Sequence, residues 1–263
     1  MIRDITIGQY YPTDSCIHRL DPRVKFIGTI CFIVSLFLFD SFYGFILCGA
    51  FLIAVILTAG LPLKFVLKGM RPMLFLLLFM MAFNLLLTPG EVIGSWWIFT
   101  VTKEGIRSAL FMGLRLVFLI MGSSIMTYTT TPNKLTDAME HIFAPLKIFR
   151  VPVHELAMMI SIALRFIPIL LEETDKIMKA QQARGADFET GNVIKKAKAL
   201  VPILVPLFVS SFRRAGELAE AMEARCYHGG KGRTKMKPLK YSMRDFAGYA
   251  VLAAYVTGMV FIP

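Results

Sequence analysis

Long apolar stretches alternate with short polar breaks along most of this chain. Five of these stretches are apolar enough to enter a bilayer, and flanking residues can extend those that fall short of the roughly 20 residues a spanning helix needs. The five are Val24 to Phe39, Tyr43 to Ala59, Met73 to Leu87, Ile106 to Thr129 and Phe246 to Ile262. The pattern predicts an all-α polytopic membrane protein with about five transmembrane helices. Met73 to Leu87 is the shortest stretch, and a re-entrant segment is the alternative there.

Two further apolar runs, Leu156 to Leu171 and Ala199 to Phe212, lie in the most basic part of the chain. Between Thr130 and Arg244 stand 19 of the 29 Lys and Arg residues, and membrane proteins keep such charge in the cytoplasm. Inserting both runs would export a cluster of six cations, which argues against it. The six are Lys176, Lys179, Arg184, Lys195, Lys196 and Lys198.

The charge distribution therefore predicts three parts. Residues 1–130 hold transmembrane helices 1 to 4 with a cytoplasmic N-terminus, residues 131–245 hold long cytoplasmic helices, and residues 246–263 hold a last transmembrane helix that ends outside. Within the middle part, the pattern predicts helices from Lys134 to Ile148, from Pro152 to about Arg184, and from Asn192 to Arg225. Prolines inside the last two predict kinks.

Composition supports a membrane protein and excludes several other classes. Of 263 residues, 56% are hydrophobic and 18% are charged. The net charge is +11, but the Lys and Arg residues lie between the apolar spans rather than along one basic face, which argues against nucleic-acid binding. The cysteines and histidines show no metal-ligand spacing, so we expect no metal and no cofactor. All 18 carboxylates lie outside the five spans. A secondary carrier and a polytopic membrane enzyme remain alternatives, but a carrier usually needs an acidic or unwound site in the membrane and an enzyme needs paired catalytic groups there, and these spans offer no acid.

Arg115 is a cation inside a predicted span. A charged residue at such a position is expensive and turns inward or toward a headgroup. We favour a packing and topology role for it over contact with a substrate.

Two of the predicted cytoplasmic helices end in nearly the same way. One ends in Ala183, Arg184 and Gly185, the other in Ala224, Arg225 and Cys226, and one constant shift along the chain superposes the two ends. Alanines on a matching face predict that the helices cross closely and present both ends side by side. A basic residue near a helix C-terminus is favoured by the helix dipole alone. Two such ends on matching helices instead favour a pair of docking residues.

Four motifs, taken together, resemble the transmembrane T component of energy-coupling factor (ECF) transporters. They are HRLDPRVK (His18 to Lys25), TTTP (Thr129 to Pro132), ARG (Ala183 to Gly185) and EARCYHGG (Glu223 to Gly230). Their order and spacing are similar to the shared type of T component, which serves several substrate-binding subunits.

The resemblance implies a function and a set of partners. It implies a non-catalytic subunit in the cell membrane of a prokaryote, bound to two ABC-type ATPases and to a membrane-embedded substrate-binding S component that captures a vitamin or a metal ion. It also implies that Ala183, Arg184 and Gly185 contact one ATPase, and that Ala224, Arg225 and Cys226 contact the other. The family usually has glycine where this chain has Cys226, so the backbone after Arg225 is the place where this chain departs from the family pattern.

Methionines such as Met158, Met159 and Met178 either form an adaptable surface for S components or fill core space.

Overall fold

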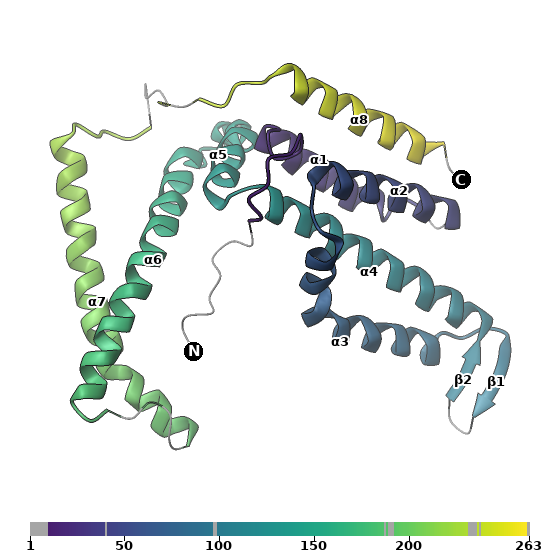
Figure 1. Cartoon of the computed structure of the whole chain (residues 1–263), viewed down its shortest axis with the longest axis horizontal. Helices are drawn as coiled ribbons and strands as arrows, with labels where there is room; N and C mark the ends of the chain where they lie inside the picture. The colour runs from purple at the N-terminus through teal and green to yellow at the C-terminus, as the bar shows by residue number, and fades with distance from the viewer. Residues whose placement is uncertain are drawn as a thin grey trace. The chain divides into compact units, whose positions relative to one another are not determined.

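The structure, a computed structural model, describes residues 10–39, 41–96, 99–186, 188, 192–230, 236 and 238–261 (Figure 1). Two compact units divide the chain. The first, the bundle unit, contains residues 8–138 and 239–263, and the second, the long-helix unit, is built on residues 139–238. Ile262, the last residue of the predicted final span, lies outside the described residues, as do the side chains of Lys195 and Lys196 from the predicted cation cluster.

The bundle unit is built from helices and one hairpin. Its helices are α1 (Pro22–Ser35), α2 (Phe42–Ala59), α3 (Leu63–Leu87), α4 (Lys103–Thr129) and α8 (Met243–Val260). Helix α3 packs along α4, while α4 and α8 each contact both α1 and α2. Strands β1 (Val92–Trp96) and β2 (Phe99–Thr102) pair antiparallel in the connection between α3 and α4. The predicted all-α class is thus confirmed, with this hairpin as the exception among the described residues.

The long-helix unit contains the two longest described helices, of 31 and 32 residues. Helix α5 (Pro132–Ile142) leads into it, a 3-10 helix η2 (Ala144–Phe149) follows, and α6 (Val153–Ala183) and α7 (Val193–Ala224) make up the rest. The bounds of α6 and α7 closely match the predicted ones. The predicted helix from Lys134 to Ile148 is instead divided between α5 and η2, because Pro145 stands at the start of η2, where its ring prevents the α-helix from continuing.

Five described helices are long and apolar enough to cross a membrane, judged by length and composition only: α2, α3, α4, α6 and residues Lys198–Glu223 of α7. The number agrees with the prediction, but the members differ. At 14 residues, α1 is about 21 Å long, which is short for a bilayer core of about 30 Å. The charge argument that places α6 and α7 in the cytoplasm stays a prediction.

The predicted span Met73 to Leu87 forms the second part of a longer helix. Helix α3 begins at Leu63, contains Pro72, and changes direction along its length in Figure 1. Its basic residues Lys64, Lys68 and Arg71 lie in the first part, so the predicted basic connection is itself helical. A proline inside a helix removes one backbone hydrogen bond and kinks the axis, which accounts for the bend.

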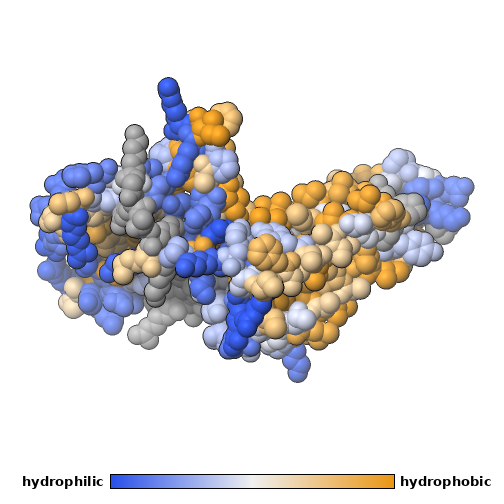
Figure 2. All heavy atoms as spheres, turned by 90° about the horizontal axis from the view of Figure 1, so that it is seen from above, coloured by the Kyte–Doolittle hydropathy of each residue, from blue (hydrophilic) through white to orange (hydrophobic). Residues whose placement is uncertain are grey.

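An apolar core with one polar cluster holds α1, α2, α4 and α8 together. Phe32, Leu36, Cys48, Ile56 and Tyr128 are each at most 4% exposed. Across this core the Tyr255 hydroxyl from α8 lies 2.7 Å from Ser35 Oγ of α1 and 3.0 Å from Cys48 Sγ of α2. The face of the bundle unit seen in Figure 2 is largely hydrophobic, as expected for helices in contact with lipid.

A buried carboxylate joins the starts of α1 and α8. Asp245 is 2% exposed; its Oδ1 accepts the Asp21 backbone N–H at 2.7 Å and its Oδ2 accepts the Ser242 backbone N–H at 2.7 Å. Asp21 in turn caps α1 by accepting the Arg23 backbone N–H at 2.9 Å. Negative charge at helix N-termini is stabilised by the helix dipole and by unpaired N–H groups, so one acid fixes two helix starts.

Candidate partner-docking site

The first candidate arginine stands at the C-cap of α6. The backbone N–H of Arg184 donates to Gln181 O at 3.1 Å, that of Gly185 to Gln182 O at 2.9 Å, and that of Ala186 to Gln181 O at 3.0 Å. Gly185 has φ +88°, in the left-handed region. These bonds form the cap in which a left-handed residue turns the chain back over the last helical turn. Helix α6 therefore ends sharply, with Arg184 at its tip.

The second candidate arginine stands at an equivalent cap on α7. The backbone N–H of Arg225 donates to Met222 O at 3.2 Å, that of Cys226 to Glu223 O at 2.8 Å, and that of Tyr227 to Met222 O at 3.0 Å. Each of these bonds is the counterpart of a bond in the α6 cap, under the same shift that superposes the two arginines. Cys226 takes the left-handed conformation with φ +55°. The departure from glycine therefore leaves the cap geometry intact, although a side chain in this conformation costs about 1–2 kcal/mol.

All six predicted contact residues are exposed: Ala183, Arg184, Gly185, Ala224, Arg225 and Cys226. Within the part of the chain that the structure describes, neither Arg184 nor Arg225 has a hydrogen bond or ion pair for its side chain. Because an arginine with its donors unoccupied is able to enter an acidic or carbonyl-lined groove, the exposure is compatible with docking and does not require it.

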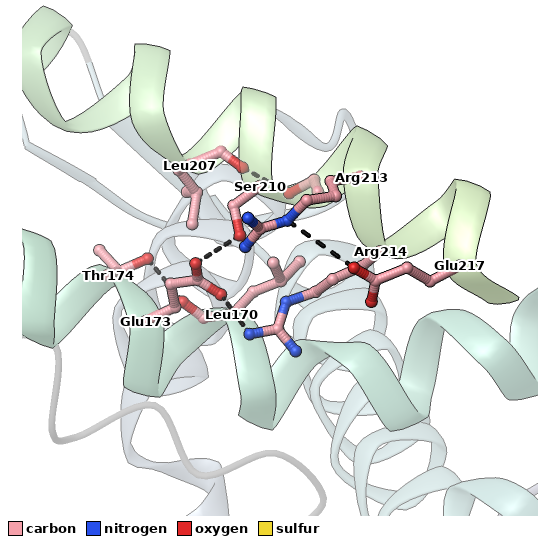
Figure 3. Close-up of polar contacts among 9 residues, drawn as sticks. Leu170, Glu173, Thr174, Leu207, Ser210, Arg213, Arg214 and Glu217 are labelled. Carbon is pink, nitrogen blue, oxygen red and sulfur yellow. Dashed lines mark hydrogen bonds and ion pairs between the residues drawn. The ribbon is translucent and has the colours of Figure 1, made fainter.

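Helices α6 and α7 cross at a polar contact rather than at an alanine face. Glu173 of α6 accepts a short hydrogen bond from Ser210 Oγ and a second, at 2.8 Å, from Arg214 Nη2, both on α7 (Figure 3). The side chains of Glu173 and Arg214 are 20% and 37% exposed. The prediction that alanine faces form the crossing is wrong, because the alanines on the two matching faces are exposed: Ala180, Ala183, Ala221 and Ala224.

The two helices run antiparallel through this crossing. Further toward the end of α6, Gln181 Nε2 donates to Pro202 O, which lies closer to the start of α7, at 3.4 Å. Arg184 and Arg225 lie equally far along the chain beyond the contacting pair Glu173 and Arg214, roughly 16 Å along each helix, in opposite directions. The two arginines are therefore roughly 30 Å apart, and the prediction that the helix ends lie side by side is wrong.

The crossing residues were missed at the sequence level although a signal was present. The shift that superposes Arg184 on Arg225 also superposes Glu173 on Arg214. Two equivalent helices that cross antiparallel, related by an approximate two-fold axis, meet at equivalent positions. Opposite charges at one such pair of positions mark the crossing point, and the equal distances from it place the two arginines symmetrically.

Two of the other motifs come together in the bundle unit. Lys25 Nζ, from the first motif, donates to Thr129 O of the TTTP motif at 2.9 Å and to His18 O at 3.3 Å. The His18 ring nitrogens lie 2.7 Å from Ser15 Oγ and 3.1 Å from Tyr11 O. Burial lowers the pKa of His18 below its ordinary value, so the neutral ring is the favoured form. These motifs therefore fasten the N-terminal segment to the start of α1 and the end of α4.

Arg115 contacts its own bundle. Its Nη2 donates to Phe39 O at 3.0 Å, and its guanidinium lies 5.5 Å from the centre of the Phe37 ring. Both contacts hold α4 against the end of α1, as expected for a cation with a packing role.

Among the described residues, no group of three or more His, Cys, Asp or Glu side chains could hold a metal ion.

Comparison with known proteins places the chain in a family. The model of the family described as cobalt transport protein, CbiQ, matches residues 13–236. The energy-coupling factor transporter transmembrane protein EcfT of Clostridium kluyveri is 56% identical to the chain over 248 residues, covering 94% of this chain and 92% of that protein. The chain belongs to the CbiQ/EcfT family.

Further relatives agree with this membership. EcfT of Ruminiclostridium cellulolyticum is 50% identical over 260 residues, which is 99% of this chain and 97% of that protein. EcfT of Bacillus subtilis is 48% identical over 246 residues, or 93% of both chains. Because each relative carries a transporter name and aligns with this CbiQ/EcfT member over nearly its whole length, the predicted resemblance to the T component is confirmed.

Proposed function

We propose that this chain is the transmembrane coupling subunit of an ECF-type ABC importer. It transmits motion from two cytoplasmic ATPases to a membrane-embedded S component, which brings a vitamin or another micronutrient into the cell. The subunit itself catalyses no reaction, because ATP hydrolysis takes place in its partners. It also carries no cofactor. Its relatives bear the name of the transmembrane protein of such a transporter.

The observation that carries this proposal is the matched pair of helix ends. Arg184 and Arg225 have the same cap geometry, are exposed, and lie in opposite directions from the Glu173–Arg214 crossing. Two equivalent tips roughly 30 Å apart suit two separate copies of similar partners better than one small binding groove. Arg184 contacts one ATPase and Arg225 the other, each with the residues that flank it at its helix tip.

The crossed pair also supplies a route for motion. An α-helix is about 1.5 Å long per residue and moves as a rigid rod. A displacement at one end of a long helix therefore reaches the other end without any change in its internal hydrogen bonds. A change in the distance between the two ATPases rotates α6 and α7 about the Glu173–Arg214 contact, and the remaining surface of the long-helix unit passes this motion to the S component. Helices α6 and α7 lie at the cytoplasmic side of the cell membrane, with the N-terminus inside and the C-terminus outside.

The test is uptake by the assembled transporter carrying Arg184→Ala and Arg225→Ala together. We expect substrate uptake to be lost and the ATPases to fail to co-purify, while the chain still inserts in membranes. Lys179→Ala and Arg213→Ala are matched controls, since each removes an exposed cation from the same two helices. Wild-type uptake and full ATPase association in the double variant would overturn the proposal.

A second experiment separates this function from a stand-alone carrier. The purified chain, reconstituted alone in vesicles, is expected to show no uptake in response to a proton or sodium gradient. Gradient-driven uptake by the chain without ATPases would instead establish the carrier.

A further inference from the structure

A partly open apolar cavity of about 530 Å³ lies among the helices of the bundle unit. Its lining comes from α1, α2, α4 and α8 and from the segment that precedes α1. The apolar part of its lining includes Phe32, Phe51, Leu52, Gly122, Val251 and Leu252. The volume lies within the range of ligand sites of about 300–1,000 Å³, and neither the docking tips nor the crossing belongs to it.

The ends of the four helices give the cavity a direction. Lys25 stands near the start of α1 and Arg244 near the start of α8, while Thr58 is near the end of α2 and Thr129 ends α4. Because the first two helices run opposite to the other two, these four residues line the same end of the cavity. From there the lining continues for about eight residues along α1 and α8, or roughly 12 Å. The cavity is thus polar at one end and apolar along its depth.

The polar end carries cations and, among the described lining residues, no carboxylate. Lys25 uses two of its three ammonium donors on Thr129 O and His18 O, which leaves one. Arg244 is exposed and has no hydrogen-bond partner within the described part of the chain. Two positive charges at the mouth of an apolar cavity complement an anion attached to an apolar chain.

We propose that this cavity binds an anionic phospholipid. One acyl chain occupies the apolar depth, and the phosphate lies at the mouth between Lys25 and Arg244. Within a bilayer an unfilled apolar space loses dispersion contacts, and lipid acyl chains are always present to fill it. Both cations lie at the predicted cytoplasmic end, where anionic headgroups attract basic residues. The bound lipid joins four helices, of which α1 is too short to span the bilayer unaided.

The test is native mass spectrometry of the full-length chain, stripped of lipid in a neutral detergent and titrated with phosphatidylglycerol or phosphatidylcholine. We expect one phosphatidylglycerol to bind saturably and about fivefold or more tightly than phosphatidylcholine, since each nearby cation contributes about that factor. Arg244→Gln is expected to lower this preference about fivefold, and Lys103→Gln, an exposed cation at the other end of α4, to leave it unchanged.

A second variant tests the cavity separately from the charge. Ala54 lines the cavity and is exposed, so Ala54→Phe fills the space without disturbing the core, and both lipids should then bind more weakly. Equal binding of the two lipids by the wild type, or unchanged binding by Ala54→Phe, would overturn the proposal. So would release of bound phosphatidylglycerol on assembly with the S component and ATPases, because a protein segment would then be the occupant.

Discussion

Removing the Glu173 carboxylate is expected to uncouple ATP hydrolysis from uptake while leaving the two arginine tips in place. Glu173→Ala deletes both polar contacts between α6 and α7 at their crossing, one from Ser210 and one from Arg214 (Figure 3). Neither contact touches Arg184 or Arg225. The ATPases should therefore still bind and hydrolyse ATP, but the two helices no longer rotate about a fixed point.

The size of the effect follows from the exposure of the pair. Hydrogen bonds to charged groups contribute about 1.5–3 kcal/mol when sheltered, and exposed ion pairs about 0.2–1 kcal/mol. Glu173 and Arg214 are 20% and 37% exposed, so the pair lies between these limits. We expect Glu173→Ala to weaken the crossing by about 2 kcal/mol in total, and a Glu173→Ala, Arg214→Ala double-mutant cycle to give a coupling of about 1 kcal/mol.

The assay is the ratio of substrate taken up to ATP hydrolysed by the complete transporter in vesicles. About 2 kcal/mol changes the population of a separated arrangement roughly thirtyfold, so the ratio should fall well below the wild-type value. The reversed pair, Glu173→Arg with Arg214→Glu, restores opposite charges at the crossing and should recover much of the ratio. The idea that the helices rotate about the Glu173–Arg214 contact would be refuted by a wild-type ratio in Glu173→Ala. It would also be refuted if the reversed pair gave a ratio no higher than its single variants do.

Three further predictions concern the caps and the bundle. Cys226→Gly removes the strain of a side chain in the left-handed conformation at the α7 cap, which should stabilise the cap by about 1 kcal/mol. Hydrogen exchange of the Tyr227 amide, which donates to Met222 O, should therefore slow, and faster exchange would contradict the prediction. Tyr255→Phe leaves Ser35 and Cys48 without their shared partner and should cost about 1–2 kcal/mol, read as a lower Tm of the purified chain, whereas an unchanged Tm would show that the cluster contributes nothing. Because burial lowers the pKa of His18, the unfolded chain binds the proton more readily, so stability should be complete above about pH 6.5 and fall as the pH drops toward the folded value; His18→Gln should flatten this part of a Tm-against-pH curve.

The sequence predicted the long helices well because their signals are local. Helices α6 and α7 begin after Pro152 and Asn192 and end at residues able to take a left-handed cap, and these boundaries depend on nearby residues alone. The interruption of the predicted helix after Ile142 also has a local signal, which is Pro145. Local sequence patterns therefore predicted where helices lie more reliably than where a helix is interrupted.

What the sequence did not predict depends on contacts between distant elements. The alanines suggested a close crossing, but the contact is made by Glu173, Ser210 and Arg214, and its position depends on the antiparallel direction of the helices. Placing both tips side by side failed for the same reason. The cavity between α1, α2, α4 and α8 likewise requires knowledge of which helices pack together, which periodicity along one segment does not contain.

Counting ATPase subunits by native mass spectrometry tests the central claim most directly. The transporter is purified through this chain without nucleotide, so that ATP does not hold the ATPases together. The account predicts two ATPase subunits on the wild type, one on Arg184→Ala, one on Arg225→Ala and none on the double variant. Two ATPase subunits retained by the double variant would contradict it.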